Sequence, residues 1–190
     1  MAAQYLKGLL DKYRKTFDVA EPFILNGKKY PAYGYFSSLS EKYVLRKDAT
    51  LWSAAAYEHV LFLKEKKCTE ELLREMQSVI EGEMEEKMVR QGRKYPGENH
   101  MYSYLTVIIL SEETPSEGCI AAAERYTFAK NYLFTLRGRA EGHLVLVDLT
   151  GRKVYTNKAA RSTRKFFEAN FDQAEASPVG ITQDVRGKQK

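Results

Sequence analysis

The stretch YLFTLRGRAEGHLVLVDLTGRKVYTN, residues 132–157, decides the fold class. It predicts three strands, YLFTLRG, HLVLVDLT and KVYTN, joined by short connections at Gly138 to Gly142 and at Thr150-Gly151. Connections this short join antiparallel neighbours, whereas a parallel pair needs a crossover of a dozen or more residues. The stretch therefore predicts an antiparallel three-strand meander.

Residues 69–90, upstream of this stretch, predict the longest helix. Thr69 is a suitable N-cap, and Glu70 and Glu71 fall in the first turn, where the helix dipole favours negative charge. Apolar residues follow at helical spacing, and the polar face carries seven glutamates against three basic residues. Further helices are predicted over residues 1–17 and 159–171.

The remaining strands are predicted from turn signals and alternation. Asn26-Gly27 in FILNGKKY predicts a hairpin, because both residues tolerate a positive φ. WSAAAYEHVLFLKEKK predicts a strand with Glu58 and His59 on opposite faces, and MYSYLTVIIL predicts another. CIAAAERYTFAKN is ambiguous between strand and helix, and its alanines favour a short helix.

Together these elements predict an α+β fold. We expect one mostly antiparallel sheet, formed by the hairpin region, the central strands and the C-terminal meander, with the long amphipathic helix and the flanking helices packed on it. The single globular domain is predicted to span residues 1–171, beginning with an amphipathic helix over 1–17. Residues 172–190 have little apolar periodicity and predict a flexible tail.

Composition sets broad limits on function. A formal net charge of +5 permits nucleic acid, acidic proteins or other anionic partners, but requires none of them. The two cysteines, Cys68 and Cys119, form no C-x-x-C motif and predict free, buried thiols in a reducing cytoplasm. The N-terminus lacks the apolar run of a signal peptide, and no stretch is long enough to cross a bilayer, so we expect a soluble cytoplasmic protein.

An aromatic cluster is the first candidate binding surface. It lies in YPAYGYFSS, where Pro31 and Gly34 predict an edge strand or an ordered loop. Aromatic side chains on such a segment indicate either a partner-binding surface or a small aromatic core under a loop. The candidate residues are Tyr30, Tyr33, Tyr35 and Phe36.

A carboxylate-based magnesium site is the clearest enzymatic hypothesis. Nucleases of the restriction-enzyme type place an Asp near one strand end and E-x-K on the next strand, and Asp48, Glu65 and Lys67 have that order. The adjacent acid and imidazole of Glu58 and His59 are further candidates. No zinc motif, nucleotide-binding glycine loop or G-x-S-x-G elbow occurs, so apart from this magnesium alternative we expect neither a metal centre nor a cofactor.

Basic residues near the C-terminus form the last candidate site. Arg161, Arg164 and Lys165 share a helix face, and Arg152 and Lys153 lie at a predicted turn. They indicate either an anion-binding face for phosphates or the solvated rim of the domain.

Three functions remain open on this basis. We expect a non-catalytic binding or interaction module, for a protein partner or for another copy of itself, because catalytic signatures are absent. The alternatives are a nucleic-acid or anion binder that uses the basic helix face, and a magnesium-dependent, nuclease-like phosphoesterase.

Overall fold

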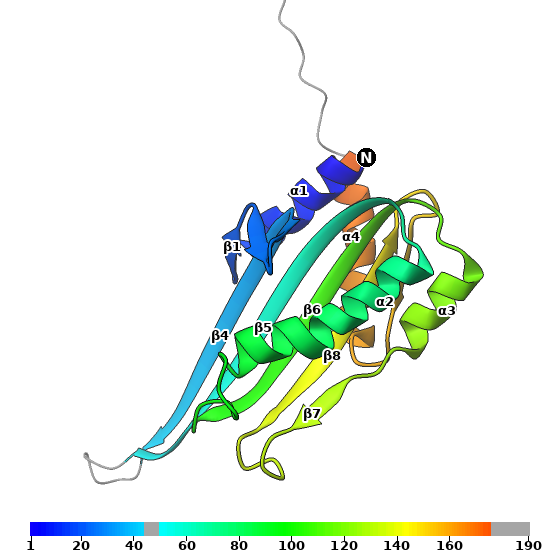
Figure 1. Ribbon diagram of the computed structural model, residues 1–190. Helices are drawn as coiled ribbons and strands as arrows, with labels where there is room; N and C mark the ends of the chain where they lie inside the picture. The colour runs from blue at the N-terminus through cyan, green and yellow to red at the C-terminus, as the bar shows by residue number, and fades with distance from the viewer. Residues whose placement is uncertain (44–49, 176–190) are drawn as a thin grey trace, which may run out of the picture.

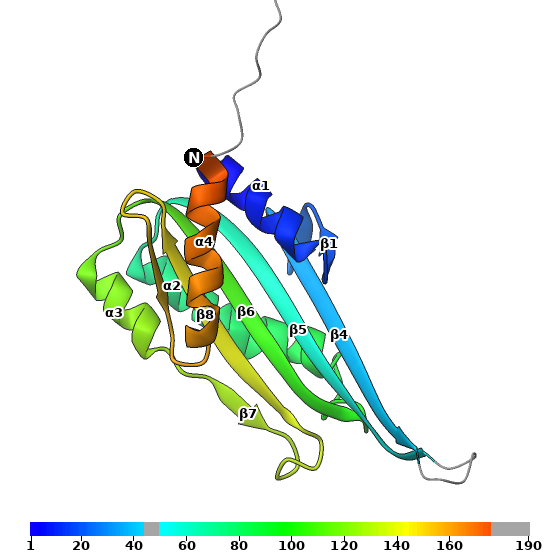
Figure 2. The ribbon, with the colours of Figure 1, turned by 180° about the vertical axis from the view of Figure 1, so that it is seen from behind.

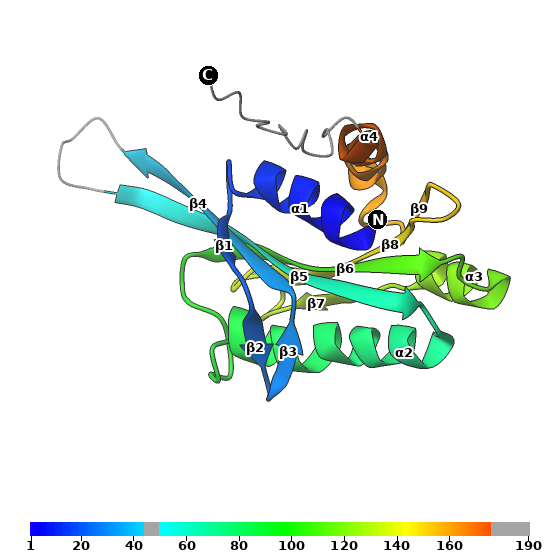
Figure 3. The ribbon, with the colours of Figure 1, turned by 90° about the horizontal axis from the view of Figure 1, so that it is seen from above.

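The computed structural model describes residues 1–43 and 50–175 and has three layers, a twisted sheet with helices on both faces (Figures 1 and 3). Helices α1 (Ala2–Tyr13) and α4 (Arg164–Glu175) pack on one face, and Figure 2 shows that they cover its upper part. Helix α2 (Glu70–Ser78), the π-helix η1 (Val79–Val89) and α3 (Glu117–Arg125) lie on the other face. A short 3₁₀ turn, η2 (Arg161–Thr163), leads into α4.

The main sheet has seven strands in the order β1-β4-β5-β6-β8-β7, with β9 also paired to β8. Its strands are β1 (Asp18–Ala20), β4 (Ala32–Tyr43), β5 (Thr50–Lys67), β6 (His100–Glu113), β7 (Ala129–Asn131), β8 (Arg139–Asp148) and β9 (Lys153–Thr156). A separate hairpin joins β2 (Phe23–Leu25) to β3 (Lys28–Tyr30).

The α+β class is confirmed, but the expectation of a mostly antiparallel sheet is only partly right. The central pairs β5–β6 and β6–β8 are parallel. Parallel neighbours need a long crossover, and α2 with η1 supplies one between β5 and β6, while α3 lies between β6 and β8. The sheet is therefore mixed.

The predicted C-terminal meander is wrong in two respects. The segment YLFTLRG is a loop rather than a strand, because Leu133, Phe134 and Thr135 adopt left-handed φ values of 48°, 53° and 73°. The short strand β7 precedes this loop. In addition, β7 and β9 do not flank β8 from two sides, since β6 occupies one edge of β8 and both short strands share the other.

Asn157 fills the gap between β7 and β9 on that shared edge of β8. The Leu144 N–H donates to Asn157 Oδ1 at 3.1 Å, and Asn157 Nδ2 donates to the Gly142 carbonyl at 2.9 Å. The Asn157 backbone N–H donates to the Leu144 carbonyl at 3.1 Å. A buried side-chain amide thus continues the strand pairing where neither β7 nor β9 reaches.

The long predicted helix is confirmed in its position and in its cap. The Leu72 N–H donates to the Thr69 hydroxyl at 3.2 Å. The second half of the helix is the π-helix η1, and its last bond runs from the Arg90 N–H to the Glu85 carbonyl at 3.1 Å. A π-helix is rare and is frequently found at functional sites.

Other local predictions are confirmed with small shifts. The Asn26-Gly27 hairpin forms with φ values of 48° and 78°, and the ambiguous segment after Cys119 forms helix α3. Strand β4 begins directly after Pro31 and contains Gly34; it is second from the sheet edge rather than the predicted edge strand, and β1 covers it over only three residues. Helix α4 runs to Glu175, beyond the predicted end of the domain. Residues 176–190 of the predicted tail lie outside the described residues.

The two sheet faces bury separate apolar cores. One core joins α2, η1 and α3 to the sheet, with Met76, Ile80 and Leu105 fully buried. The other joins α1 and α4 to it, with Leu9 and Phe62 fully buried. Within the described part of the chain, no helix combines the length and the apolar character needed to span a membrane.

The two cysteines are buried neighbours in the first core. Cys119 Sγ lies 3.3 Å from Cys68 Sγ, and both residues are at most 1% exposed. Burial raises the pKa of both thiols, and thiolates are the reactive form.

We therefore expect both thiols to resist modification in the folded protein. Reaction with Ellman's reagent at about pH 8 should be slow under native conditions, because few thiols are ionised there, and should reach two thiols per chain only in denaturant. A cysteine introduced as Lys66→Cys, at an exposed side chain, is the matched control and should react at once. Rapid native modification of either natural thiol would contradict this prediction.

Candidate functional site

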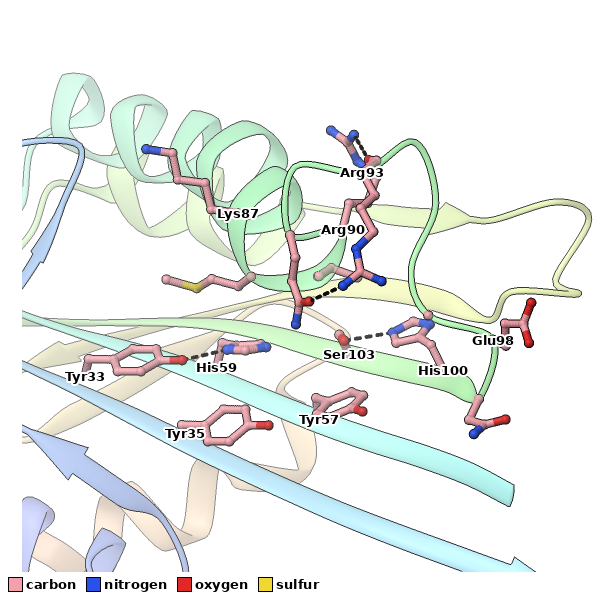
Figure 4. Close-up of a pocket in the computed structure, with 15 residues that line it drawn as sticks. Tyr33, Tyr35, Tyr57, His59, Lys87, Arg90, Arg93, Glu98, His100 and Ser103 are labelled. Atoms are coloured by element: carbon pink, nitrogen blue, oxygen red, sulfur yellow. Dashed lines mark hydrogen bonds between the residues drawn. The ribbon is translucent and has the colours of Figure 1, made fainter. Parts of the chain in front are cut away.

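A pocket with a volume of about 650 Å³ lies between the sheet and the end of η1 (Figure 4). We call it the tyrosine pocket. Its floor consists of Tyr33, Tyr35, Tyr57, His59, His100 and Ser103, from β4, β5 and β6. The end of η1 and the loop that follows it form the roof, with Lys87, Met88, Arg90, Gln91 and Arg93.

Strand alternation places the floor residues on one face. Tyr35 pairs with His59 across β4 and β5, and Tyr57 pairs with Ser103 across β5 and β6. Residues two apart along a strand share a face, so Tyr33 joins Tyr35. The rings form a continuous aromatic surface, in which Tyr35 stacks on Tyr57 at 6.4 Å between ring centroids.

His59 is held neutral at one end of this surface. Its Nδ1 is hydrogen-bonded to the Tyr33 hydroxyl at 2.7 Å, and its ring lies against Tyr35 at 5.3 Å. Burial, and to a lesser extent repulsion from His100, lowers the pKa of His59 to about 4. At neutral pH the imidazole therefore contributes a polar, uncharged group to the pocket.

A β-bulge brings His100 to the same face as Ser103. Ala55 pairs with His100, but the next residue, Ala56, pairs with Tyr102, so Met101 is the extra residue. Bulges re-aim side chains and are common beside active sites. As a result His100 Nε2 lies 2.9 Å from Ser103 Oγ, although regular alternation would put residues three apart on opposite faces.

The second nitrogen of His100 is fixed by the loop before β8. His100 Nδ1 lies 2.8 Å from the Arg137 carbonyl oxygen. The imidazole also stacks on Tyr57, at 6.0 Å between centroids and 7° between planes, and meets Tyr132 edge-on at 5.9 Å. Burial lowers the pKa of His100, and its hydrogen bond to the Arg137 carbonyl opposes this only in part.

A buried carboxylate anchors the end of η1 behind the roof. Glu85 is 2% exposed and accepts hydrogen bonds from Arg90 Nε at 2.8 Å and from the Tyr132 hydroxyl at 2.7 Å. Lys130 Nζ lies 3.0 Å away. Burial by itself raises the pKa of Glu85, but the hydrogen bonds from Arg90, Tyr132 and Lys130 outweigh it and lower the pKa below its ordinary value.

The roof presents two cations that are available to a ligand. Arg93 Nη2 donates to Gln91 Oε1 at 3.3 Å, and Lys87 is exposed. No carboxylate among the described residues lies within ion-pair distance of either. Glu98, the acidic residue of the lining, is paired with Arg137 at 3.1 Å. A cationic roof over an aromatic floor suits a flat ligand that carries an anionic group.

The predicted aromatic surface is divided by the sheet. Tyr33 and Tyr35 line the tyrosine pocket, whereas Phe36 lies on the other face of β4 and packs on Phe17 at 5.5 Å. Tyr30 is 1% exposed and belongs to the core beneath α2 and η1. Of the four predicted partner-binding residues, only Tyr33 and Tyr35 therefore lie in the same pocket.

The enzymatic candidates are dispersed as well. Glu58 and His59 face opposite sides of β5, as alternation predicts, and Glu58 accepts a hydrogen bond from Thr106 at 3.0 Å. Glu65 and Lys67 lie near the C-terminal end of β5, and Asp48 lies outside the described residues. No group of three or more His, Cys, Asp or Glu side chains in residues 1–43 and 50–175 is arranged to hold a metal ion.

Three of the five basic candidates meet at a second cavity of about 430 Å³. Arg152, Lys153 and Arg164 line it, but so do Glu168 and Asp172. Arg152 pairs with Asp172 at 3.0 Å, and Arg164 lies 3.6 Å from Glu124. Arg161 and Lys165 are exposed and do not line this cavity. Acidic neighbours therefore offset much of the basic charge there.

Sequence reasoning missed His100 and Ser103, because their contact depends on the bulge at Met101. The available signal was the polar pair at the start of an otherwise apolar strand. Glu85 was also missed, since it is one of seven glutamates on a helix whose exposed face was expected to be acidic.

Comparison with known proteins gives one match. A family model described as a domain of unknown function (DUF8052) matches residues 1–169. Neither the curated proteins nor the solved structures contain a match to the chain.

Proposed function

The chain belongs to the DUF8052 family of domains of unknown function, and from the geometry of the tyrosine pocket we propose that it is a binding module for a flat ligand bearing an anionic group. The observation that carries this proposal is that Lys87 and Arg93 line the same pocket as the aromatic floor, although the Lys87 side chain points away from that floor in Figure 4. The pocket volume of about 650 Å³ lies in the range of small-molecule sites. The ligand is either a free small molecule or a side chain of a protein partner or of a second copy.

Minimal probes test this chemistry. Phenyl phosphate should bind more tightly than cyclohexyl phosphate or inorganic phosphate in calorimetric titrations, because only the planar ring stacks on the tyrosines. The double variant Lys87→Ala/Arg93→Ala should weaken phenyl phosphate binding about tenfold or more, since charge-assisted hydrogen bonds are among the stronger ones. The same titration with a tyrosine-phosphorylated peptide separates a partner segment from a free molecule.

A charge-matched variant controls for general electrostatic attraction. Lys7 and Arg125 are exposed residues of α1 and α3, outside the pocket. Lys7→Ala/Arg125→Ala removes the same charge and should leave binding within about a factor of two, because salt screens distant exposed charges. Equal weakening in both double variants, or no binding of phenyl phosphate to the wild type, would refute the proposal.

The other two functions have less support. An anion or nucleic-acid site at Arg152, Lys153 and Arg164 is supported by their shared cavity, but Glu168 and Asp172 line that cavity too. A magnesium-dependent phosphoesterase is supported only by the order of Asp48, Glu65 and Lys67 in the sequence.

A further inference from the structure

We propose that Ser103 and His100 form a nucleophile and general-base pair that transfers the acyl group of carboxylic esters bound in the tyrosine pocket. This activity goes beyond ligand binding. It requires that the pocket admit a substrate, but it does not require Lys87 and Arg93. Failure of the binding test above would therefore leave this activity standing, and failure of the labelling test below would leave the proposed anion binding standing.

The hydrogen bonds around His100 determine which of its nitrogens carries the proton. A carbonyl oxygen accepts and never donates, so the Nδ1 that faces the Arg137 carbonyl at 2.8 Å carries the hydrogen. In the neutral ring, Nε2 then has a lone pair directed at Ser103 Oγ, 2.9 Å away. This is the arrangement of an activated nucleophile: a hydroxyl, a base within hydrogen-bond reach, and a third group that orients the base.

Several unusual backbone features maintain this arrangement. The bulge at Met101 turns His100 toward Ser103. Gly138, with a φ of 75°, packs closely enough that an added Cβ would lie 2.7 Å from His100 Nδ1. The stacked ring of Tyr57 and the edge-on ring of Tyr132 then restrict rotation of the imidazole. A catalytic base needs this kind of fixed orientation.

The pair is positioned to meet a substrate. Both residues line the tyrosine pocket, and Figure 4 shows Ser103 between His100 and the pocket interior. Ser103 is only 1% exposed, so a reactant can reach it only from the pocket. A flat acyl or aryl group lying on Tyr35 and Tyr57 would bring its carbonyl carbon toward the Ser103 hydroxyl.

The proposed reaction balances without a cofactor. Ser103 Oγ attacks the ester carbonyl carbon, its proton moves to His100 Nε2, and the C–O bond to the alcohol breaks. The departing alcohol takes the proton from Nε2. Water then attacks the acyl-enzyme, again through Nε2, and releases the carboxylic acid and the free serine, so the sum is an ester plus water giving an acid plus an alcohol.

Labelling with an alkyl fluorophosphonate tests the first step directly. The Oγ–P bond should form and the P–F bond should break, giving one adduct per chain by intact-mass spectrometry, on Ser103 by peptide mapping. The adduct should be absent in Ser103→Ala. Ser37→Ala is the matched control, because Ser37 is an exposed serine of β4 that pairs with Tyr57 of β5, and its loss should leave labelling unchanged.

His100→Gln separates a base from a structural anchor. A glutamine amide retains a donor for the Arg137 carbonyl and an acceptor for Ser103, but it is not a base. We expect this variant to keep the wild-type melting temperature within a few degrees and to label about 10²-fold more slowly. The proposal is overturned if the wild type forms no Ser103 adduct under conditions that label a known serine hydrolase, or if folded His100→Gln labels at the wild-type rate.

Discussion

Replacing Gly138 with alanine should lower the free energy of unfolding by about 3–5 kcal/mol, one of the largest effects expected from a single methyl group in this chain. Gly138 has a φ of 75°, where a Cβ costs about 1–2 kcal/mol. In addition, the new Cβ would overlap the Met101 carbonyl oxygen and would lie 2.6 Å from that of His100. Both are backbone atoms, so the loop or the bulge must move.

Urea denaturation followed by circular dichroism measures this effect, and two other glycines provide the control. Gly27 and Gly92 also have positive φ values, of 78° and 72°, but an added Cβ at either has no neighbour within 4 Å. Alanine at these two positions should cost only the backbone strain, about 1–2 kcal/mol. If Gly138→Ala lowers the free energy of unfolding by no more than these controls do, the loop is not packed tightly against the bulge.

Arg90→Ala should lower the free energy of unfolding by about 2–3 kcal/mol at neutral pH, because removing one partner of a buried ion pair leaves the other charge poorly compensated. Glu85 would keep only Tyr132 and Lys130. The effect falls below the usual cost of breaking such a pair, about 3–5 kcal/mol, because these two partners remain. Lys66→Ala, which removes an exposed pair with Glu113, should change stability too little to measure.

The effect of Arg90→Ala should also depend on pH. The pKa of Glu85 is lowered in the folded protein, so its contribution to stability is present above the ordinary carboxyl pKa and is lost as the pH falls through the folded value. The difference in stability between wild type and Arg90→Ala should therefore shrink in acid, at pH values below about 4. A difference that stays constant as the pH falls to about 3 would show that the carboxylate of Glu85 is not its source.

Local signals predicted the elements that local chemistry determines. The Thr69 cap, the Asn26-Gly27 turn and the opposite faces of Glu58 and His59 depend on residues that are close in sequence, and all three are confirmed. The two central strand pairings could not be obtained in this way. Parallel pairing is set by where a crossover helix returns the chain, which depends on contacts distant in sequence.

The loop at residues 132–138 shows why the meander was mispredicted. Its apolar and aromatic residues, YLFTL, match a strand, but in the structure the backbone is left-handed at Leu133, Phe134 and Thr135. Backbone hydrogen bonds close the loop, among them the one from the Tyr132 N–H to the Gly138 carbonyl at 2.9 Å. The loop places the Arg137 carbonyl next to His100. The segment that departs from its predicted strand conformation therefore makes a tertiary contact at the candidate site.

The amide of Asn157 has a consequence for how this protein behaves at high concentration. An open sheet edge is a template on which a second chain can add a strand, and such addition leads to aggregation. Along β8 that template is interrupted, because β7 covers its start, β9 covers its end and one asparagine occupies the positions between them. A single side chain thus completes the protection of the longest strand on that side of the sheet from edge-to-edge association.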